Sequence, residues 1–380
     1  MNIVIAIDSL KGSLSSLEAG HAIAEGIRRV SSTANLIVKP LADGGEGTVE
    51  ALTYQKPCVI EKITVTGPLD SPILCEYHRL PKTQTAIIEM AGAAGLTLVP
   101  ESQRNPLYTT TYGVGEVIKD AIKKGCRNFI IGIGGSATND GGVGMLQALG
   151  FDFLTEDGHS VPHGAIGLSV LKSISAKHIL PELAECHFHI ASDVSNPLCG
   201  EYGCSAVYGP QKGASPSMIQ DMDHWLSQYA AIASKYNPNS NASAPGAGAA
   251  GGLGFAFLTF TNATLKSGVQ IVLDECNFAK DVETADLIIT GEGRLDGQTA
   301  MGKAPIGVAA LAKKYHKPVV ALAGCVTKDA RICNQHGIDA FFPILRTIVT
   351  LEEAMEPKLT KENLSDTAEQ VFRLWNIKEV

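Results

Sequence analysis

Charged and hydroxyl side chains gather directly after several apolar segments of this chain. The first cluster, DSLKGSLSS, follows the apolar run IVIAI and holds a carboxylate, an ammonium group and hydroxyls, namely Asp8, Lys11, Ser9 and Ser13. Backbone N–H groups at the start of a helix attract anions, and a nearby lysine adds positive charge. A serine here could instead serve only as the N-cap of the following helix. The segment therefore predicts either an anion-binding loop or a helix cap.

A second cluster, ADGGEGT, places Asp43 and Glu46 among three glycines. Glycines let a backbone approach a ligand closely, and paired carboxylates are suited to holding Mg²⁺ or orienting a hydroxyl. The alternative is a tight turn with Glu46 in the first turn of a helix. Both interpretations remain open from the residues alone.

A third cluster lies in IIGIGGSATNDGGVG, where Gly132, Gly134 and Ala137 have the spacing G-x-G-x-x-A of a dinucleotide site. That fingerprint requires its last small residue to pack inside the start of a helix, but a polar turn, TNDGG, intervenes. We therefore favour an anion-binding turn of glycine N–H groups. Its members would be Gly134, Gly135, Ser136, Thr138, Asn139 and Asp140.

The segment CHFHIASDVSNP places His187 and His189 on one face of a predicted strand. Two imidazoles suggest a metal site, but no further His or Cys follows at ligand spacing, which favours structural histidines. Asp193 and Asn196 lie in the loop beyond. A carboxylate at a strand end is well placed to accept a hydroxyl proton or to bind Mg²⁺.

Local cations for an anionic ligand are Arg104, in RNPLYTTTYGVGEVI, and Lys212, which follows Gln211 in YGPQKGAS. A lone lysine is more often a solvated surface charge. The segment GEGRLDGQTAMGKAP contains G-x-x-x-x-G-K ending at Lys303, but Ala304 stands where a P-loop has its Mg²⁺-binding hydroxyl. A Walker site is therefore disfavoured, and a phosphate loop of another kind remains possible, with Gly291, Glu292 and Asp296 in its first half.

The elements that position these clusters alternate between short apolar segments and helical patterns, which is typical of an α/β protein with mostly parallel sheets. Strands are expected at 3–8, 35–41, 285–290, 318–324 and 340–345, and helices at 17–30, from about 48, at 304–315 and at 361–375. Between 63 and 80 the pattern becomes hairpin-like, with a break at Gly67 and Pro68. We predict a discontinuous first domain, 1–65 and 282–380, and an inserted α/β domain, 66–281.

Composition limits the classes of partner. The 380 residues are 45% hydrophobic and carry a net charge of -8, without a basic run for nucleic acid or an anionic membrane. The start MNIVIAIDS has no basic leader, and no apolar stretch approaches the roughly 18 residues of a membrane span. Nine scattered cysteines without a C-x-x-C pair indicate reduced thiols. These features predict a cytoplasmic protein.

Seven blocks, taken in order, resemble the signature segments of the bacterial glycerate kinase family (type 1). They are IAIDSLKGSLSS, LADGGEGT, GIGGSATNDGG, ASDVSNPLCG, YGPQKGA, GAGAAGGLGF and ADLIITGEGRLDGQTAMGKAP. The resemblance runs from residue 3 to about residue 325. The family pattern has APDS and FKGS where this chain has Ile7 and Leu10, and these apolar substitutions leave Asp8 and Lys11 intact.

The resemblance implies ATP-dependent phosphorylation of D-glycerate with Mg²⁺ as cofactor, giving 2-phosphoglycerate in many members of the family. It implies a flavodoxin-like doubly wound parallel sheet formed by both chain ends and an inserted domain likened to restriction endonucleases, with the active site in the cleft between them. Glu292 and Asp296 would face the inserted domain. The protein would act on small molecules as a monomer or homodimer.

Phosphoryl transfer depends on positioning, on neutralisation of charge and on a group that receives the hydroxyl proton. We expect Asp193 to accept that proton or to bind Mg²⁺, with Asp296 as a further metal ligand. Lys11 and Lys212 would neutralise the transferring group, and Arg104 would bind the glycerate carboxylate bidentately.

The glycine turns at 134–142 and 291–297 would cradle phosphates. Further contacts to substrate or nucleotide are expected from Asp8, Ser9, Ser13, Asp43, Glu46, Gly134, Gly135, Ser136, Asn139, Asp140, Asn196, Gln211, Gly291, Glu292, Asp296 and Lys303. Three alternatives remain. They are phosphorylation of the 3-hydroxyl, an NAD-dependent oxidoreductase based on the G-x-G-x-x-A spacing, and a periplasmic-type binding protein, which would need an export signal.

Overall fold

The computed structural model describes residues 1–45 and 47–377 and divides the chain into two compact units. Unit 1 comprises Met1–Tyr54 and Ser267–Val380, and unit 2 comprises Gln55–Lys266. The boundaries expected after residues 65 and 281 differ from this division because each falls inside an element. Residue 65 lies in β3, which pairs with β4 of unit 2, and residue 281 lies in α10, which packs on β1 and α11 of unit 1.

Unit 1 is built on a five-stranded sheet in the order β2, β1, β11, β12, β13, in which every neighbouring pair is parallel. Its strands are β1 (Asn2–Ile7), β2 (Asn35–Val38), β11 (Leu287–Leu295), β12 (Val319–Val326) and β13 (Ala340–Pro343). Counted along the chain within the unit, the order is 2-1-3-4-5. The order therefore reverses between β1 and β11, and this is where ligands bind in open α/β sheets.

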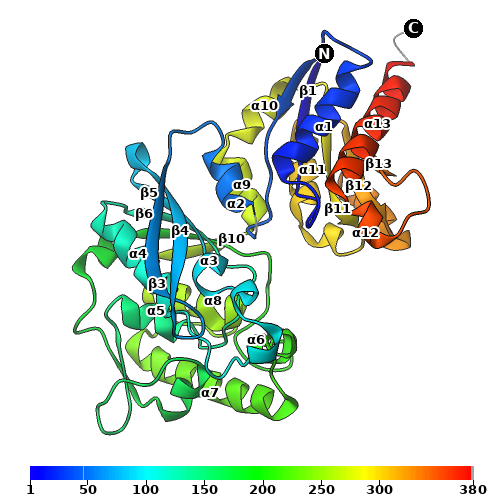
Figure 1. Cartoon of the computed structure of the whole chain (residues 1–380). Helices are drawn as coiled ribbons and strands as arrows, with labels where there is room; N and C mark the ends of the chain where they lie inside the picture. Colours follow the sequence, from blue (N-terminus) through cyan, green and yellow to red (C-terminus); the bar gives the residue numbers. More distant parts are fainter. Residues whose placement is uncertain (46, 378–380) are drawn as a thin grey trace. The chain divides into compact units, whose positions relative to one another are not determined.

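Helices cover both faces of this sheet (Figure 1). Ile3, Ile5 and Ile7 pack in one core with α1 and α13, and the alternation along a strand turns Val4 and Ala6 to the opposite face, where α10 and α11 lie. Burial of both faces explains why β1 is almost continuously apolar. The helices of unit 1 are α1 (Ser16–Arg28), α2 (Thr48–Thr53), α9 (Gly268–Glu275), α10 (Phe278–Thr284), α11 (Ala304–Lys314), α12 (Leu351–Ala354) and α13 (Pro357–Asn376).

One strand of unit 1 is longer than the sequence indicates. The expected strand ends at Thr290, with a glycine turn at 291–297, whereas β11 continues to Leu295 and pairs with β12 along this stretch. The phosphate-cradling turn predicted at 291–297 is therefore wrong for 291–295. The physical reason is that β11 and β12 approach each other closely at Gly291, which has φ +156. A Cβ at this position would lie 1.8 Å from the carbonyl oxygen of Leu322, so glycine is needed for the strand pairing and not for a turn.

Unit 2 contains a six-stranded mixed sheet in the order β10, β9, β6, β5, β4, β3. The hairpin expected between 63 and 80 is present as β3 and β4, and the segment from β5 through β10 is parallel. The strands are β3 (Val59–Thr66), β4 (Pro72–Leu80), β5 (Thr85–Glu89), β6 (Asn128–Gly132), β9 (His187–Ala191) and β10 (Ala263–Lys266), with a separate pair β7 (Asp152–Leu154) and β8 (Ser173–Ser175).

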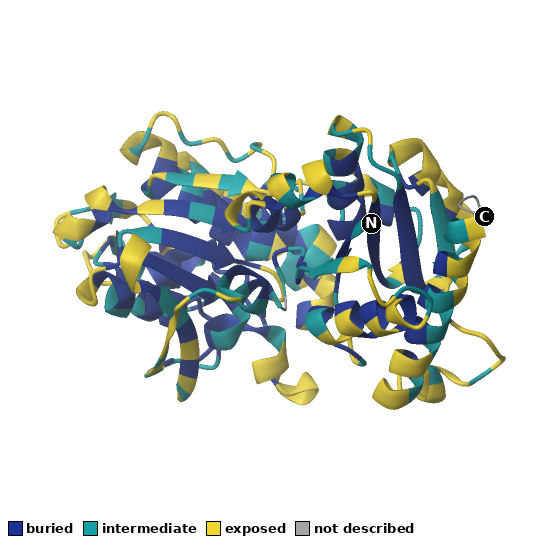
Figure 2. Ribbon diagram, turned by 90° about the horizontal axis from the view of Figure 1, so that it is seen from above, coloured by how far each residue is buried: buried dark blue, intermediate teal, exposed yellow. Residues whose placement is uncertain are grey.

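The helices of unit 2 enclose an aromatic core. They are α3 (Ala91–Ala94), α4 (Tyr112–Lys123), α5 (Val143–Ala148), α6 (Cys204–Tyr208), α7 (Pro216–Tyr236) and α8 (Ala249–Phe260). Phe129 and Phe188, on neighbouring strands, stack with ring centroids 4.7 Å apart, and Tyr229 meets Phe255 edge to face at 5.3 Å. Figure 2 shows that the central strands of each unit are largely buried.

Two expectations from composition are testable on the described residues. All nine cysteines lie among them and none forms a disulfide, as the scattered spacing predicted. Within residues 1–45 and 47–377, none of the helices combines the length and the apolar character that crossing a bilayer requires.

Candidate active site

A cavity of about 620 Å³ lies in unit 1 at the carboxyl ends of β1, β2 and β11. It gathers predicted residues from three segments that are far apart in the sequence: Asp8, Ser9, Lys11, Ser13, Asp43, Glu292, Asp296 and Lys303. The cavity thus forms beside β1 and β11, where the strand order reverses. Glu46 lies outside the described residues.

The first loop of the cavity is fixed by backbone and serine hydrogen bonds. The amide of Asp8 donates to the carbonyl of Gly291 at 2.9 Å, so the end of β1 is joined to β11. Ser15 is the N-cap of α1 and forms a capping box with Glu18, which confirms the helix-cap interpretation for this serine. The buried hydroxyl of Ser16 donates to the carbonyl of Ile7 and accepts from the amide of Leu41, which ties the loops after β1 and β2 together.

Asp8 is a buried carboxylate, only 4% exposed, at the base of this cavity. Burial, followed by repulsion from Asp43, raises its pKa from 3.8 to about 7, and Glu292 adds to the effect. Hydrogen bonding from Ser9 and the charge of Lys11 act in the opposite direction. Burial is also the main cause of the raised pKa of Glu292, whose Oε1 accepts a hydrogen bond from the Thr299 hydroxyl at 2.5 Å. The negative charges of these carboxylates are therefore only partly neutralised by the neighbouring cations and hydrogen-bond donors.

Cations face these carboxylates from two sides of the cavity. Lys11 is exposed, and its Nζ lies 3.4 Å from Oδ2 of Asp43. Lys303 is the N-cap of α11, and its charge acts on Glu292. Asp296 is partly committed to its own turn, because its Oδ1 accepts from two backbone amides, of Gln298 and Thr299.

Sequence reasoning missed one whole wall of the cavity. The missing wall comes from the C-terminal segment: Ile344, Leu345, Leu351, Ala354, Met355, Thr360 and Asn363. Most of these residues are apolar and none lies in a glycine-rich segment, so only the folded chain reveals them. Arg294 of β11, whose Nε lies 3.4 Å from Oδ2 of Asp296, also lines the cavity and was not among the predicted site residues.

The predicted cluster after β6 lies in unit 2, and part of it is turned inward. Asp140 is fully buried, and its carboxylate accepts hydrogen bonds from the amide and hydroxyl of Thr111, both at 2.8 Å, and from the amides of Gly142 and Gly144. Burial nevertheless raises its pKa. The carboxylate therefore holds the starts of α4 and α5 together instead of pointing to solvent.

Asn139 is also fully buried and donates to the hydroxyl of Ser205 at 2.8 Å. Helix α5 begins only at Val143, so Ala137 does not pack inside a helix start as the G-x-G-x-x-A dinucleotide fingerprint requires. The oxidoreductase alternative loses its structural basis here.

Lys212 is a buried cation of unit 2, only 2% exposed. Its ammonium donates to Oγ of Ser136 at 2.8 Å and to the carbonyl of Thr138 at 2.6 Å. Burial lowers its pKa from 10.5 to about 8. Gly134 and Gly135, just before Ser136, are exposed. A buried cation is thus attached to the base of an exposed glycine turn.

Arg104 lies beside the same lysine. Gly213, the residue after Lys212, packs so closely on Arg104 that a Cβ there would lie 2.3 Å from the arginine carbonyl oxygen. The Nε of Arg104 is buried without a hydrogen-bond partner among the described residues. The backbone of Arg104 therefore packs next to the turn that carries Lys212.

Other predicted residues of unit 2 lie in the segments after β9 and at 210–212. Asp193 and Gln211 are exposed. Asn196 accepts from the Tyr208 hydroxyl at 2.7 Å and donates to the carbonyl of Tyr202, so it shapes its own loop. His189 contacts the hydroxyl of Thr264, in agreement with a structural role.

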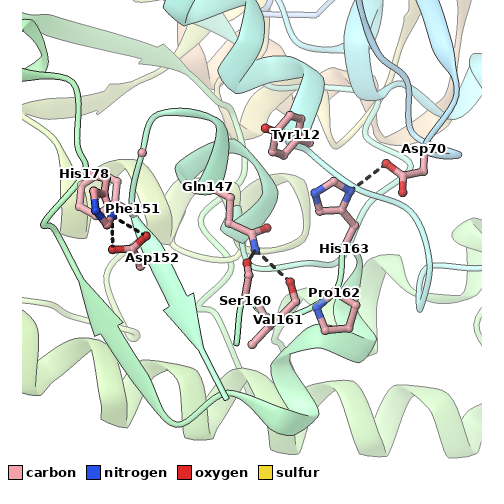
Figure 3. Close-up of a pocket in the computed structure, with 11 residues that line it drawn as sticks. Asp70, Tyr112, Gln147, Phe151, Asp152, Ser160, Val161, Pro162, His163 and His178 are labelled. Atoms are coloured by element: carbon pink, nitrogen blue, oxygen red, sulfur yellow. Dashed lines mark hydrogen bonds and ion pairs between the residues drawn. The ribbon is translucent and has the colours of Figure 1, made fainter. Parts of the chain in front are cut away.

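A second cavity, of about 540 Å³, contains none of the predicted residues (Figure 3). Two histidine and carboxylate pairs lie in separate parts of its wall: Nδ1 of His163 is 2.8 Å from Asp70, and Nδ1 of His178 is 3.0 Å from Asp152. Gln147 donates between them to Ser160. Across residues 1–45 and 47–377, no group of three or more His, Cys, Asp or Glu side chains is arranged to hold a metal on its own.

Comparison with known proteins identifies relatives over the whole chain. Residues 3–376 match the model of the Glycerate kinase family. The glycerate kinase of Haemophilus influenzae is 46% identical over all of both chains, and the glycerate 2-kinase of Escherichia coli is 48% identical over 93% of each. A crystal structure attributed to glycerate kinase 2 of Salmonella typhimurium LT2 superposes with a TM-score of 0.90 at 46% identity, covering 100% of this chain and 99% of that one. This likeness supports an α/β fold with parallel and mixed sheets.

The buried carboxyl of Asp8 predicts a pH-dependent gain in stability for Asp8→Asn. The native pKa of about 7 exceeds the ordinary 3.8, so the stability that protonated Asp8 contributes is complete below about pH 4 and is lost as the pH rises through 7. We expect the ligand-free variant to be more stable than the wild type at pH 8, by on the order of 3 kcal/mol, and the gain to shrink toward pH 5. Thermal melts at both pH values measure it.

Glu362→Gln, which removes an exposed carboxylate of the same unit, is the matched control and should give little change at either pH. Equal melting temperatures for the wild type and Asp8→Asn at pH 8 would contradict the claim that the buried, charged carboxylate of Asp8 destabilises the ligand-free protein.

Proposed function

The chain belongs to the glycerate kinase family and is therefore a kinase of glycerate, and we propose that it transfers the terminal phosphoryl group of ATP to the 2-hydroxyl of D-glycerate. The bond from the γ-phosphorus to the bridging oxygen breaks, a bond to the substrate oxygen forms, and ADP and 2-phosphoglycerate leave. The observation that carries the proposal is the gathering of eight predicted residues in the unit 1 cavity. The name of the Escherichia coli relative, glycerate 2-kinase, supports the choice of hydroxyl.

The finer description of the fold is part of this proposal. The strand order 2-1-3-4-5, with helices on both faces, supports a flavodoxin-like doubly wound domain for unit 1. The likeness of unit 2 to restriction endonucleases rests on the family resemblance, and its mixed sheet agrees with it.

Magnesium is the proposed cofactor, and the unit 1 cavity fits it. Mg²⁺ is usually bound through one or two carboxylates, with waters and substrate phosphates completing its shell, so a complete protein cage is not required. Asp43 and Glu292 raise the pKa of Asp8, and a divalent cation would relieve this repulsion. Asp8 and Asp43 would hold the ion, in place of Asp296, whose oxygens are engaged in its turn and with Arg294. When bound, Mg²⁺ neutralises charge on the phosphates.

Two cations of unit 2, Lys212 and Arg104, are proposed to bind the anionic groups of the reaction. The ammonium of Lys212 fixes the turn through Ser136 and supplies positive charge next to the exposed glycines. The guanidinium of Arg104 is suited to bidentate binding of the glycerate carboxylate. In unit 1, Lys11 and Lys303 would contact phosphate oxygens.

Asp193 is proposed to receive the proton of the glycerate hydroxyl. It follows β9 in an exposed segment, so its carboxylate is accessible to a small substrate. In kinases of other families a carboxylate performs the same task. This role replaces the metal-ligand role for Asp193.

The activity itself is tested by incubating the full chain with ATP, Mg²⁺ and D-glycerate. We expect ADP formation that depends on D-glycerate and a product whose phosphorus NMR spectrum, with coupling to the substrate protons, is that of 2-phosphoglycerate. A spectrum of 3-phosphoglycerate would correct the choice of hydroxyl. The absence of any phosphorylated glycerate would overturn the proposed function.

Asp193→Asn tests the proton acceptor. We expect kcat to fall by about 100-fold or more with little change in the KM for ATP, because the amide cannot take up the proton. Asp157→Asn, which alters another exposed aspartate of unit 2, is the control and should keep wild-type turnover. Near-wild-type kcat in Asp193→Asn would rule out this role.

The buried ammonium of Lys212 predicts opposite effects of alkaline pH on activity and on stability. Its pKa of about 8 means that kcat/KM should fall as the pH rises through 8, because the neutral amine no longer attracts anions. The unfolded chain keeps the proton up to about pH 10.5, so the contribution of this group to stability rises over the same interval.

Measurement of kcat/KM and of the melting temperature between pH 7 and 10 separates these effects. Lys212→Met should lower kcat by about 100-fold, whereas Lys212→Arg should retain part of the activity and move the alkaline decline to higher pH. Wild-type activity in Lys212→Met would exclude a role for the charge.

A further inference from the structure

The unit 1 cavity has two chemically different ends. Charged and hydroxyl side chains from the loops after β1, β2 and β11 form one end. The other wall comes from the C-terminal segment and is mainly apolar, with Ile344, Leu345, Leu351, Ala354 and Met355 beside the polar Thr360 and Asn363. A ligand that uses the whole cavity must therefore be charged or metal-bound at one end and apolar at the other.

The apolar wall is exposed more than a core would be. Leu351 is 76% exposed, Leu345 37% and Met355 36%. Burying a side chain of this kind gains roughly 1.5–3 kcal/mol relative to leaving it exposed, so a ligand with an apolar face would be stabilised by covering these residues. The unburied apolar area thus points to a bound group with an apolar face.

This wall is held firmly against the charged end. The amide of Ile344 donates to the carbonyl of Ala323 at 2.8 Å, which fixes the start of the segment on β12. At the far end, the hydroxyl of Ser13 bonds that of Thr360 at 2.7 Å. Between them, Met355 lies so close to Gly12 that a Cβ there would be 2.5 Å from its Cε. In Figure 1, α13 lies beside α1, and β12 and β13 continue the sheet beyond β11.

We propose that the unit 1 cavity is the nucleotide site and that Leu345, Leu351 and Met355 form the wall on which the adenine ring packs. The inference rests on the proposed function and deepens it. A volume of about 620 Å³ lies within the range of sites for cofactor-sized ligands. Glycerate is small and polar throughout, so it has no use for an apolar wall, whereas ATP joins a flat base to a polyanion. The triphosphate then lies toward Lys11 and Lys303.

A pair of variants in one segment tests this assignment. Leu351 lines the cavity, whereas Ile348, which is 104% exposed, is absent from its lining and provides the matched control. Isothermal titration of the full chain with Mg²⁺ and either ADP or inorganic tripolyphosphate separates the base from the phosphates. We expect Leu351→Ala to weaken ADP binding by about three- to tenfold and to leave tripolyphosphate binding unchanged, with Ile348→Ala like the wild type for both.

Two results would overturn the proposal. The first is wild-type ADP affinity in Leu351→Ala, whether or not the KM for D-glycerate rises. The second is equal weakening of ADP and tripolyphosphate binding. Failure of the proposed function is recognised separately. In that case ADP would still bind with the expected dependence on Leu351, but no glycerate would be phosphorylated.

Discussion

Uncompensated carboxylate charge at the end of β1 is the constraint around which unit 1 is organised. The parallel order β2, β1, β11 brings the carboxyl ends of three strands together, so Asp8, Asp43 and Glu292 meet at one edge of the sheet. Burial and repulsion from neighbouring carboxylates disfavour the charged forms of Asp8 and Glu292. A neutral residue at position 8 would avoid this energetic cost. The presence of a carboxylate is therefore best explained by a cationic or Mg²⁺-bearing ligand that binds to it.

Burial also disfavours the charged form of Lys212 in unit 2, but here the charge is positive and the pKa is lowered. Among residues 1–45 and 47–377, the hydrogen-bond acceptors of this buried ammonium are the Ser136 hydroxyl and the Thr138 carbonyl, which are neutral, so it loses its hydration without a full opposite charge in exchange. Its attachment to Ser136 places the charge next to the exposed glycines of the turn. Unit 1 therefore concentrates negative charge suited to a metal, and unit 2 concentrates positive charge suited to carboxylate or phosphate groups.

The sequence predicted those parts of the molecule that depend on local chemistry. The run IVIAI indicated β1 because burial on both faces demands continuous apolar residues, and the polar loops after β1 and β2 indicated the cavity. Residues whose roles depend on tertiary contacts could not be assigned. Asp140 resembled a ligand but binds backbone amides, and Gly291 resembled a phosphate turn but allows β11 to approach β12. Leu351 gave no signal, because an exposed leucine acquires meaning only from the cavity that it lines.

The most direct test of the account is a carbon NMR titration of the Asp8 carboxyl group in the full chain, assigned by its absence in Asp8→Asn. Without ligand, the account predicts a pKa of about 7. With saturating ADP and Mg²⁺, we expect the pKa of Asp8 to lie far below 7, because the bound cation favours the charged carboxylate. An ordinary pKa near 3.8 in the ligand-free protein, or a pKa of about 7 that the Mg²⁺ nucleotide leaves unchanged, would contradict the claim that this carboxylate is kept for the nucleotide and its metal.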